Sequence, residues 1–286
     1  MDAASAGIVG AGRLGSTLAL ALAERGGLRL RAVSTGDRET ARSLTRELPG
    51  LELYSPEELV RRCRWVFLTA PDDRLAELAA ALPFGPDQRV IHCSGALGLD
   101  VLSAARAAGA EVGCLHPLQT FPNRCGEPER FDTISCGVEA PEPLGRELTQ
   151  LAERLGARVL RLEGVDRSAY HAAAVLASNY VVALHAAAAE AFELAGLPGE
   201  QARQAMAPLT RAAAAAIEAQ PLPLALTGPI ARGDSQTVAR QLSALAERPQ
   251  LRELYRRLGR ALLSLPLPHD ETTRATLAAV LRGAPR

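Results

Sequence analysis

The chain has 286 residues, enough for two domains, and its hydrophobic content of 48% and charged content of 22% are typical of a soluble globular protein. Its formal net charge is zero and only 3% of its residues are aromatic, so neither a basic surface nor a stacking platform for nucleic acid is expected. The first residues, "MDAASAG", lack the basic and apolar regions of a signal peptide, which favours a cytoplasmic location.

Residue counts restrict the chemistry further. All 32 basic residues are arginine, so no lysine is present to act as an acid, a base or a Schiff-base former. The cysteines are odd in number and form no CxxC pair, which excludes a disulfide framework and suits a reducing compartment; they are Cys63, Cys93, Cys114, Cys125 and Cys136. His116, His171 and His185 lack ligand spacing with nearby cysteines or carboxylates, so no bound metal is expected.

A glycine-rich turn follows the first predicted strand. "AGIVGAGRLGSTLALALAERG" predicts a strand at 6–9, the pattern G-x-G-x-x-G, and a helix over 14–24. The first glycine permits the tight turn, the second lets a pyrophosphate approach the backbone, and the third allows close packing of helix on strand. A dinucleotide is therefore expected at this helix N-terminus. The predicted contacts are Gly10, Ala11, Gly12, Arg13, Leu14 and Gly15.

The end of the second strand bears on which dinucleotide binds. After the strand "LRLRAVS" the chain reads Ser34, Thr35, Gly36, Asp37, Arg38. Hydroxyl groups and a guanidinium suit the 2′-phosphate of NADP(H), so Ser34, Thr35 and Arg38 are predicted cofactor contacts. A carboxylate reading the ribose of NAD(H) is the alternative. Asp37 lies beyond the strand end, however, and is expected to cap the helix that starts near Arg38. NADP(H) is therefore preferred over NAD(H).

Strands and helices continue to alternate over the first half. Strands are expected at 65–71, 89–95, 110–117, 132–140 and 157–163, with helices at 75–82, 99–108 and 144–155. This alternation predicts an α/β fold, a Rossmann-like doubly wound sheet over residues 1–164, with ligands at the carboxyl ends of its strands. Those ends carry further predicted cofactor contacts and two candidates for proton transfer or substrate binding. They are Thr69, Ala70, Pro71, Ser94 and Gly95 for the cofactor, and His116 and Gln119 for the substrate side.

Residues 165–286 are predicted to form an all-α domain that supplies the other wall of the substrate site. Long helices are expected from Asp166 or Ser168 to Leu194, then over 198–219, 235–247, 249–265 and 272–281. The loop "LTGPIARGDSQTV" precedes one of these helices and is either a simple connector or a ligand-binding loop. In the second case Arg232 would bind a substrate carboxylate and Thr227 would add a hydrogen bond.

An uncharged stretch from Ser168 to Ala189 is long enough to cross a bilayer. It is mostly alanine, however, and contains two histidines and an asparagine, which are costly in lipid. A helix buried inside the protein is therefore expected, with no membrane as a partner. At 100° per residue, His171, Ser178 and Asn179 fall on one broad helical face. The interpretation is that this face lines the nicotinamide site, the alternative being core residues bonded to neighbouring loops.

The chain resembles the ketopantoate reductase-like branch of the 6-phosphogluconate and β-hydroxyacid dehydrogenase superfamily. More closely, it is similar to a bacterial group that joins a Rossmann-like domain to a helical domain of unknown function. The matching segments are "GIVGAGRLGSTLALAL", "VFLTAPDD", "HCSGALG", "LHPLQTF", "YHAAAVLASNYVVAL" and "LTGPIARGD". This resemblance implies NADPH-dependent reduction of a small 2-oxo acid in a cleft between the domains, and a homodimer formed through the helical domain.

The resemblance also assigns roles. Ketopantoate reductases carry a catalytic lysine early in the interdomain helix and asparagines one and two turns later. His171 stands at the lysine position, Val175 at the first asparagine and Asn179 at the second, which puts ketopantoate itself in doubt. Prephenate dehydrogenases place a histidine–proline pair beyond a Rossmann strand, so His116 is a second candidate for proton transfer. The predicted catalytic residues are therefore His171, Asn179 and His116, with Ser178 orienting the substrate oxygen.

Two other functions stay open at this point. The chain can be an imine reductase resembling pyrroline-5-carboxylate reductase, or a dehydrogenase working in the oxidative direction, because the sequence does not separate C=O from C=N chemistry. It can also be a non-catalytic regulatory module that binds NADP(H) through its first half and a protein through its second.

Overall fold

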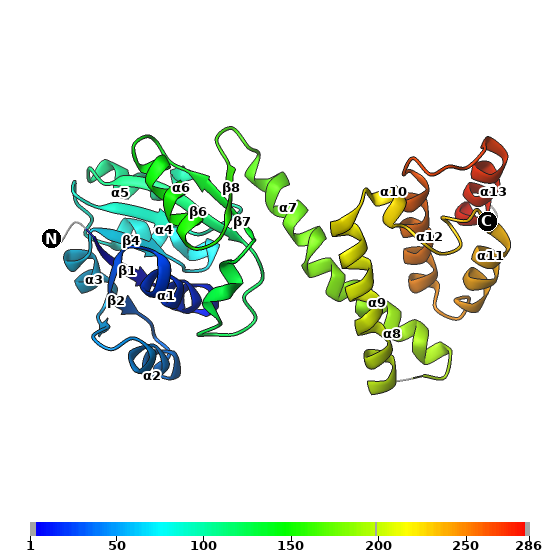
Figure 1. Cartoon of the computed structure of the whole chain (residues 1–286), viewed down its shortest axis with the longest axis horizontal. Helices are drawn as coiled ribbons and strands as arrows, with labels where there is room; N and C mark the ends of the chain where they lie inside the picture. Colours follow the sequence, from blue (N-terminus) through cyan, green and yellow to red (C-terminus); the bar gives the residue numbers. More distant parts are fainter. Residues whose placement is uncertain (1–3, 198, 284–286) are drawn as a thin grey trace. The chain divides into compact units, whose positions relative to one another are not determined.

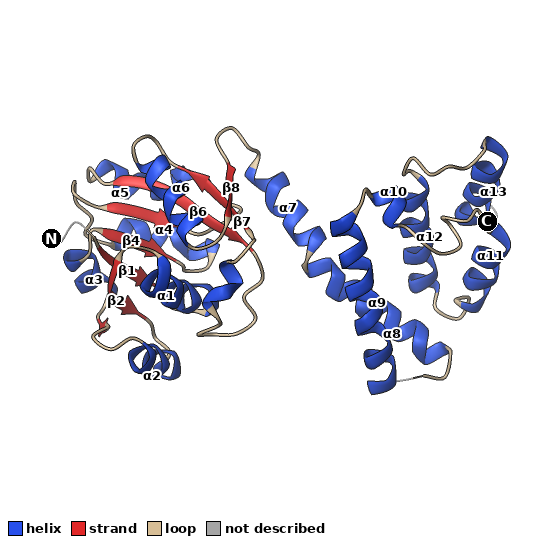
Figure 2. Ribbon diagram, viewed as in Figure 1, coloured by secondary structure: helices blue, strands red, loops and turns tan. Residues whose placement is uncertain are grey.

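The computed structural model describes residues 4–197 and 199–283 of the chain and divides into two units (Figure 1). The first unit ends at Ser178 and the second begins at Asn179. The first contains the sheet and the helices around it, and the second is helical (Figure 2).

The first unit is built on one eight-stranded sheet with the order β3-β2-β1-β4-β5-β6-β7-β8. Its strands are β1 (Ser5–Val9), β2 (Arg29–Ser34), β3 (Glu52–Leu53), β4 (Trp65–Leu68), β5 (Arg89–His92), β6 (Glu111–Leu118), β7 (Ser135–Glu139) and β8 (Arg158–Arg161). All neighbouring strands are parallel except β6 and β7, which are antiparallel. The order reverses between β1 and β4, where the doubly wound fold opens its ligand crevice. The predicted α/β fold is therefore confirmed; the two-residue β3 was not predicted.

Helices pack on both faces of this sheet. They are α1 (Arg13–Arg25), α2 (Arg38–Glu47), α3 (Pro56–Arg62), α4 (Asp72–Ala81), the 3-10 helix η1 (Leu99–Leu102), α5 (Ser103–Ala107), the 3-10 helix η2 (Pro128–Phe131), α6 (Leu144–Arg154) and α7 (Arg167–Ala177). Consecutive strand residues point to opposite faces. In β4, Val66 packs with Leu59 of α3 and Leu75 of α4, whereas Phe67 belongs to the core that includes Leu18 of α1. Two hydrophobic cores therefore sandwich the sheet.

The second unit contains helices alone. They are α8 (Asn179–Leu194), α9 (Glu200–Ala219), α10 (Leu222–Ala225), α11 (Ser235–Ala244), α12 (Pro249–Leu263) and α13 (Glu271–Arg282). Its buried core is small and lies among α11, α12 and α13, with Val238, Leu263 and Leu277 from the three helices. The predicted helices are present, and the single-turn α10 was not predicted.

The predicted long helix after residue 166 is interrupted. Ser178 departs from helical geometry, with φ −127° and ψ −68°, and separates α7 from α8. The first unit includes α7, because the start of this helix contacts the sheet. Arg167 pairs with Glu139 of β7, and Tyr170 contacts His116 of β6.

The predicted burial of this stretch is wrong for the chain as described. Over Arg167–Leu194 the helix is long and apolar enough to span a membrane by length and composition, with a mean hydropathy of 1.5, yet none of its most apolar window is buried. The main contacts of α8 among the described helices are with α9 and α12. Large apolar side chains are left exposed, among them Leu176, Tyr180 and Val182, the last with 71% of its surface accessible.

Candidate functional site

The turn between β1 and α1 is tied to the end of β2. Gly10 has a φ of +94°, in the left-handed region that glycine adopts without strain. The N–H groups of Gly10 and Ala11 donate to the carbonyl of Ser34, at 3.0 and 3.1 Å. The glycine turn and the second strand end therefore form one rigid edge, as a dinucleotide site requires.

The other two glycines of the motif differ in what surrounds them. A Cβ on Gly15 would lie 2.6 Å from the carbonyl oxygen of Gly10 and would collide with Thr69 Oγ1. A Cβ on Gly12 would meet only the Gly10 oxygen, at 3.8 Å, so this position faces open space. No side chain caps the N-terminus of α1, and its first turn carries no acidic residue. These residues fit a pyrophosphate, which needs backbone access at Gly12 and unopposed helix N–H groups.

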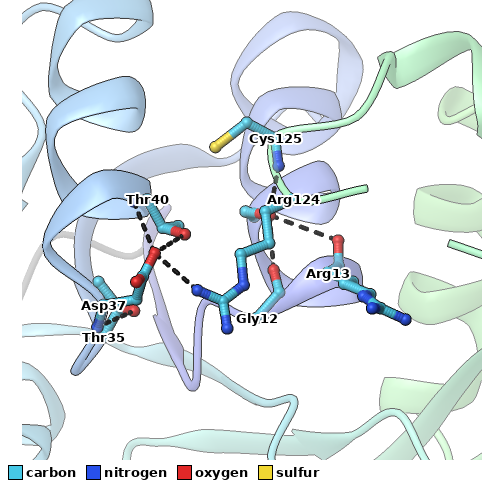
Figure 3. A network of polar contacts seen from close by, with 8 residues as sticks. Gly12, Arg13, Thr35, Asp37, Thr40, Arg124 and Cys125 are labelled. Atoms are coloured by element: carbon cyan, nitrogen blue, oxygen red, sulfur yellow. Dashed lines mark hydrogen bonds and ion pairs between the residues drawn. The ribbon is translucent and has the colours of Figure 1, made fainter. Parts of the chain in front are cut away.

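A cavity of about 480 Å³ opens beside this turn at the end of β2. Its lining residues are Arg13, Asp37, Glu39, Thr40, Ser43, Pro122, Asn123, Arg124 and Cys125. Asp37 Oδ2 accepts from the backbone N–H and the hydroxyl of Thr40, at 2.8 and 2.5 Å, and Arg124 Nη1 lies 2.7 Å from the same oxygen (Figure 3). Asp37 therefore caps α2, as predicted. The bonds from Thr40 and the Arg124 guanidinium hold the pKa of this carboxyl at about 2.

Arg38, the predicted 2′-phosphate contact, does not line this cavity. It is exposed at the first position of α2. The arginines at the cavity are Arg13 and Arg124. Arg124 was missed because it lies in a loop after β6, far along the chain from β2, and only the tertiary structure brings it to Asp37.

The ends of β4 and β5 carry polar groups that stabilise local turns. Thr69 Oγ1 donates to the carbonyl of Gly10 at 2.8 Å, which links β4 to the glycine turn. Ser94 Oγ accepts from the N–H groups of Ala96 and Leu97, both at 3.2 Å. The remaining predicted cofactor contacts lie on neighbouring elements. Leu14 is in α1, Thr35 follows β2, and Ala70 and Pro71 lie between β4 and α4.

His116 is the centre of a second group of side chains, at the carboxyl end of β6. Its Nδ1 lies 2.9 Å from the Tyr170 hydroxyl, with the two rings edge to face. Gly95, at the end of the neighbouring β5, packs so closely on this imidazole that a Cβ would lie 2.7 Å from Nε2. The predicted proximity of Gly95 and His116 at one edge of the sheet is therefore present, and Tyr170 is an additional partner that the sequence reasoning missed.

Electrostatics around His116 favour its neutral form. Burial, followed by the charges of His171 and Arg167, lowers the pKa of His116 to about 4. Burial also raises the pKa of Tyr170 above its usual value. At neutral pH the pair is therefore an uncharged imidazole beside a protonated phenol.

Polar atoms without a hydrogen-bond partner surround the same pair. Among the described residues these include His171 Nδ1, His92 Nε2, and Nε and Nη1 of Arg167. His92 is fully buried, and burial together with the Arg167 and His116 charges lowers its pKa to about 3. Buried polar groups normally have protein or water partners, so this region has capacity to bind water or a ligand group. The sequence did not predict that Arg167 and His92, which are buried on separate elements, would lie near His116.

Two of the predicted substrate residues make local hydrogen bonds in the first unit, and three others lie in the second unit. Gln119 is exposed and its side-chain oxygen accepts from the N–H of Thr120 at 2.8 Å. The Ser178 hydroxyl donates to the carbonyl of Ala174 at 2.8 Å. The remaining three belong to the second unit; they are Asn179, Thr227 and Arg232. Thr227 lines an apolar pocket of about 270 Å³ with Tyr255, and Arg232 is exposed.

The cysteines are all unpaired thiols. Four are buried, and burial raises their pKa, to about 11 for Cys63 and Cys114 and to about 12 for Cys136. Such thiols are protonated core residues rather than nucleophiles. Within the described ranges, no three histidine, cysteine or carboxylate side chains gather as a metal site would require.

Comparisons with known families divide the chain in a similar way. Residues 2–117 match a Rossmann-like domain, and residues 134–262 match a domain of unknown function, DUF2520. This pairing confirms the predicted combination of a Rossmann-like domain with a helical domain of unknown function, although the second match begins within the sheet at β7. No curated protein has a sequence similar enough to match the chain.

Solved structures resemble nearly the whole chain. A Bacteroides fragilis protein provisionally described as an NADP oxidoreductase is 25% identical, with a TM-score of 0.71 over 91% of this chain and 97% of its own. A Thermotoga maritima protein is 27% identical, with a TM-score of 0.67 over 90% and 96%. The 1-pyrroline-5-carboxylate reductase of Streptococcus pyogenes is 16% identical, with a TM-score of 0.60 over 91% and 98%, a likeness that shows the fold alone.

A pair of glycine variants tests the packing of the turn. Gly15→Ala should lower the free energy of unfolding by about 1–3 kcal/mol, because the new methyl group collides with backbone. Gly12→Ala should change it by less than about 0.5 kcal/mol, because its methyl group enters open space. Urea unfolding followed by the fluorescence of Trp65, the single tryptophan, measures both. Equal losses would contradict the proposed difference between the two positions.

The lowered pKa values predict acid sensitivity of the first unit. The pKa values of His116 and His92 are near 4 and 3 in the folded protein but 6.5 in the unfolded chain. As the pH falls, the unfolded chain therefore takes up these two protons at a higher pH than the folded protein does. The free energy of unfolding should therefore fall as pH drops from 6.5 towards 4, by up to about 1.4 kcal/mol per pH unit for each group. Unfolding of His116→Gln should show a shallower slope in this window. An unchanged slope would show that the imidazole does not titrate as described.

Proposed function

We propose that the chain is an NADPH-dependent oxidoreductase that reduces a small 2-oxo acid. The observation that carries this proposal is the open backbone at Gly12 on the same sheet edge that holds His116 against Gly95. A nucleotide laid across that edge would have its phosphates at α1 and its nicotinamide towards β5 and β6. Similarity to a protein described as an NADP oxidoreductase supports the reaction class.

The chain's own residues would hold the cofactor in parts. The turn from Gly10 to Gly15 would bind the pyrophosphate, Thr69 to Pro71 would face the ribose and nicotinamide, and Ser94 would lie near the carboxamide. The bound cofactor would supply a hydride. The protein must then position the acceptor carbon, and it must provide a proton for the oxygen or nitrogen that becomes negatively charged.

His116 is suited to position the acceptor oxygen rather than to carry charge. In the proposed arrangement the Tyr170 phenol donates its hydrogen to Nδ1 of the neutral imidazole, which leaves the imidazole hydrogen on Nε2. Nε2 faces the bare backbone of Gly95 at the strand ends. A neutral N–H donor at this point can polarise a carbonyl without giving up its proton.

His171 is the proposed proton donor. It follows Tyr170 directly on α7, affects the pKa of His116 electrostatically, and has a buried Nδ1 without a protein partner in the described structure. In this proposal His116 serves as the neutral donor and His171 gives up the proton. Asn179, Ser178, Gln119, Thr227 and Arg232 remain predicted substrate contacts.

An imine acid is the second candidate substrate. Similarity of the fold to 1-pyrroline-5-carboxylate reductase supports it, because the same hydride and proton transfers reduce C=N bonds. Consumption of NADPH in the presence of 2-oxo acids or cyclic imines would separate the two. A regulatory module would bind NADPH without turning over any member of either set.

Variants of the two α7 side chains test the mechanism. His171→Gln should lower kcat about 10²- to 10⁴-fold, because a general acid is lost. Tyr170→Phe should lower kcat/KM about tenfold and alter its pH profile, because His116 loses the partner that fixes its tautomer. Initial rates of NADPH oxidation from about pH 5 to 9, with the best substrate from the panel, measure both effects.

Tyr54→Phe is a matched control, since this tyrosine stacks with Arg62 and has no proposed role in catalysis or dimerisation, and its rates should be unchanged. Full turnover by His171→Gln would exclude its role as proton donor. A rate for Tyr170→Phe equal to that of the control would exclude the tautomer argument.

The proposed partner is a second copy of the chain, bound through the helical unit. Several helices of this unit carry large exposed apolar side chains, and exposed apolar surface can mark an interaction site. They include Tyr180, Val182 and Leu184 on α8, Leu209 and Ile217 on α9, and Leu222 and Leu224 on α10. A homodimer would cover this surface in the cytoplasm, the predicted location.

A charge placed on this surface should disrupt the dimer. Val182→Glu should shift the protein from dimer to monomer, because a carboxylate would be buried without a partner. Sedimentation velocity measures the distribution. Ala246→Glu adds the same charge at an exposed position outside these helices and should leave the dimer intact. A dimer that survives Val182→Glu, or a monomeric wild-type protein, would contradict the proposal.

A further inference from the structure

The cavity at the end of β2 contains an arginine from an unexpected part of the chain. We infer that Arg124, from the loop after β6, is the residue that selects the phosphorylated ribose of NADPH over the ribose of NADH. This inference rests on the proposed function, since it concerns the same cofactor. It differs from the sequence-based expectation, which gave this role to Arg38.

The position of Arg124 is the first argument. Its Nη1 lies 2.7 Å from Asp37 Oδ2, and Arg124 lines the same cavity as Asp37 and Arg13, the residue that follows Gly12 in the glycine turn (Figure 3). The end of β2 is where the ribose 2′ group of a bound dinucleotide lies in this fold. Arg124 is therefore at the place where a 2′-phosphate would arrive, whereas Arg38 is exposed outside the cavity lining. In the same view the Arg13 side chain is directed away from Asp37 and Arg124.

The attachment of the loop is the second argument. The N–H groups of Cys125 and Gly126 donate to the hydroxyls of Ser16 and Thr17, at 2.7 and 3.1 Å. Both hydroxyl residues are fully buried in α1, the helix whose N-terminus faces the pyrophosphate site. The backbone next to Arg124 is thus fixed to the cofactor helix, so the guanidinium is held in place before any ligand binds.

The charges around Arg124 are the third argument. Asp37 is an obstacle to a phosphate, because two anions would repel each other. Its Oδ2 is already engaged by Thr40 and by Arg124 Nη1, so the carboxylate is turned towards α2 and its charge is partly neutralised. A guanidinium has five N–H donors in a planar fork, which lets it pair with Asp37 and bind a phosphate at the same time.

Direct binding measurements test this inference. Isothermal titration calorimetry would give Kd for NADPH and NADH, and for 2′,5′-ADP and 5′-AMP, with wild-type protein and Arg124→Gln. The substitution should weaken NADPH and 2′,5′-ADP about 10- to 100-fold, because a charge-assisted contact to the phosphate is lost. Kd for NADH and 5′-AMP should change less than about twofold. Because Arg124 is about half exposed, with 52% of its side chain accessible, the variant should fold normally.

Arg38→Gln is the matched control and should change none of the four Kd values by more than about twofold. A loss of NADPH affinity in Arg38→Gln but not in Arg124→Gln would overturn the inference and restore the sequence-based expectation. Tighter binding of NADH than of NADPH by the wild-type protein would also overturn it, since Asp37 would then read the ribose hydroxyls. Failure of the wild-type protein to bind either dinucleotide would instead exclude the proposed function.

Discussion

The packing of the first turns of α7 on the sheet is the contact on which the candidate chemistry depends. Arg167 is nine-tenths buried and pairs with Glu139 of β7, while Tyr170 contacts His116 of β6. A buried ion pair adds little stability by itself, yet removing one partner leaves an uncompensated charge at a cost of about 3–5 kcal/mol. The pair therefore fixes where α7 begins and how it lies on β6 and β7, and so where Tyr170 and His171 are.

This packing also explains the properties of the imidazoles beneath it. Burial lowers the pKa of His92 and of His116, and the charge of Arg167 at the start of α7 opposes their protonation. The fold thereby keeps histidines neutral at a pH where exposed ones are partly charged. Strongly shifted groups gathered at the ligand-binding edge of a sheet are typical of functional sites, although structural networks produce such shifts as well.

The sheet edge carries two different environments. At β1 and β2 it offers backbone N–H groups, the N-terminus of α1 and the Arg124–Asp37 pair, which suit phosphates. At β5 and β6 it offers Gly95 and the His116–Tyr170 pair, which suit a neutral polar reacting group. Proteins described as an NADP oxidoreductase and as a pyrroline carboxylate reductase have folds similar to this one, and a fold alone does not identify a substrate.

The sequence by itself determined the order of strands and helices, the glycine turn and the cap at Asp37. These features depend on residues that are close together in the chain. They are the alternation of β4 side chains between the two cores, the left-handed conformation of Gly10, and the hydrogen bond from the Thr40 N–H to Asp37. Only the tertiary structure decided that Arg124 rather than Arg38 lies at the cavity, that Tyr170 is bonded to His116, and that the apolar helix is exposed. Each of these depends on which distant segments of the chain come together. An ion pair, a hydrogen bond or a buried surface needs two partners, and a single stretch of sequence contains only one of them.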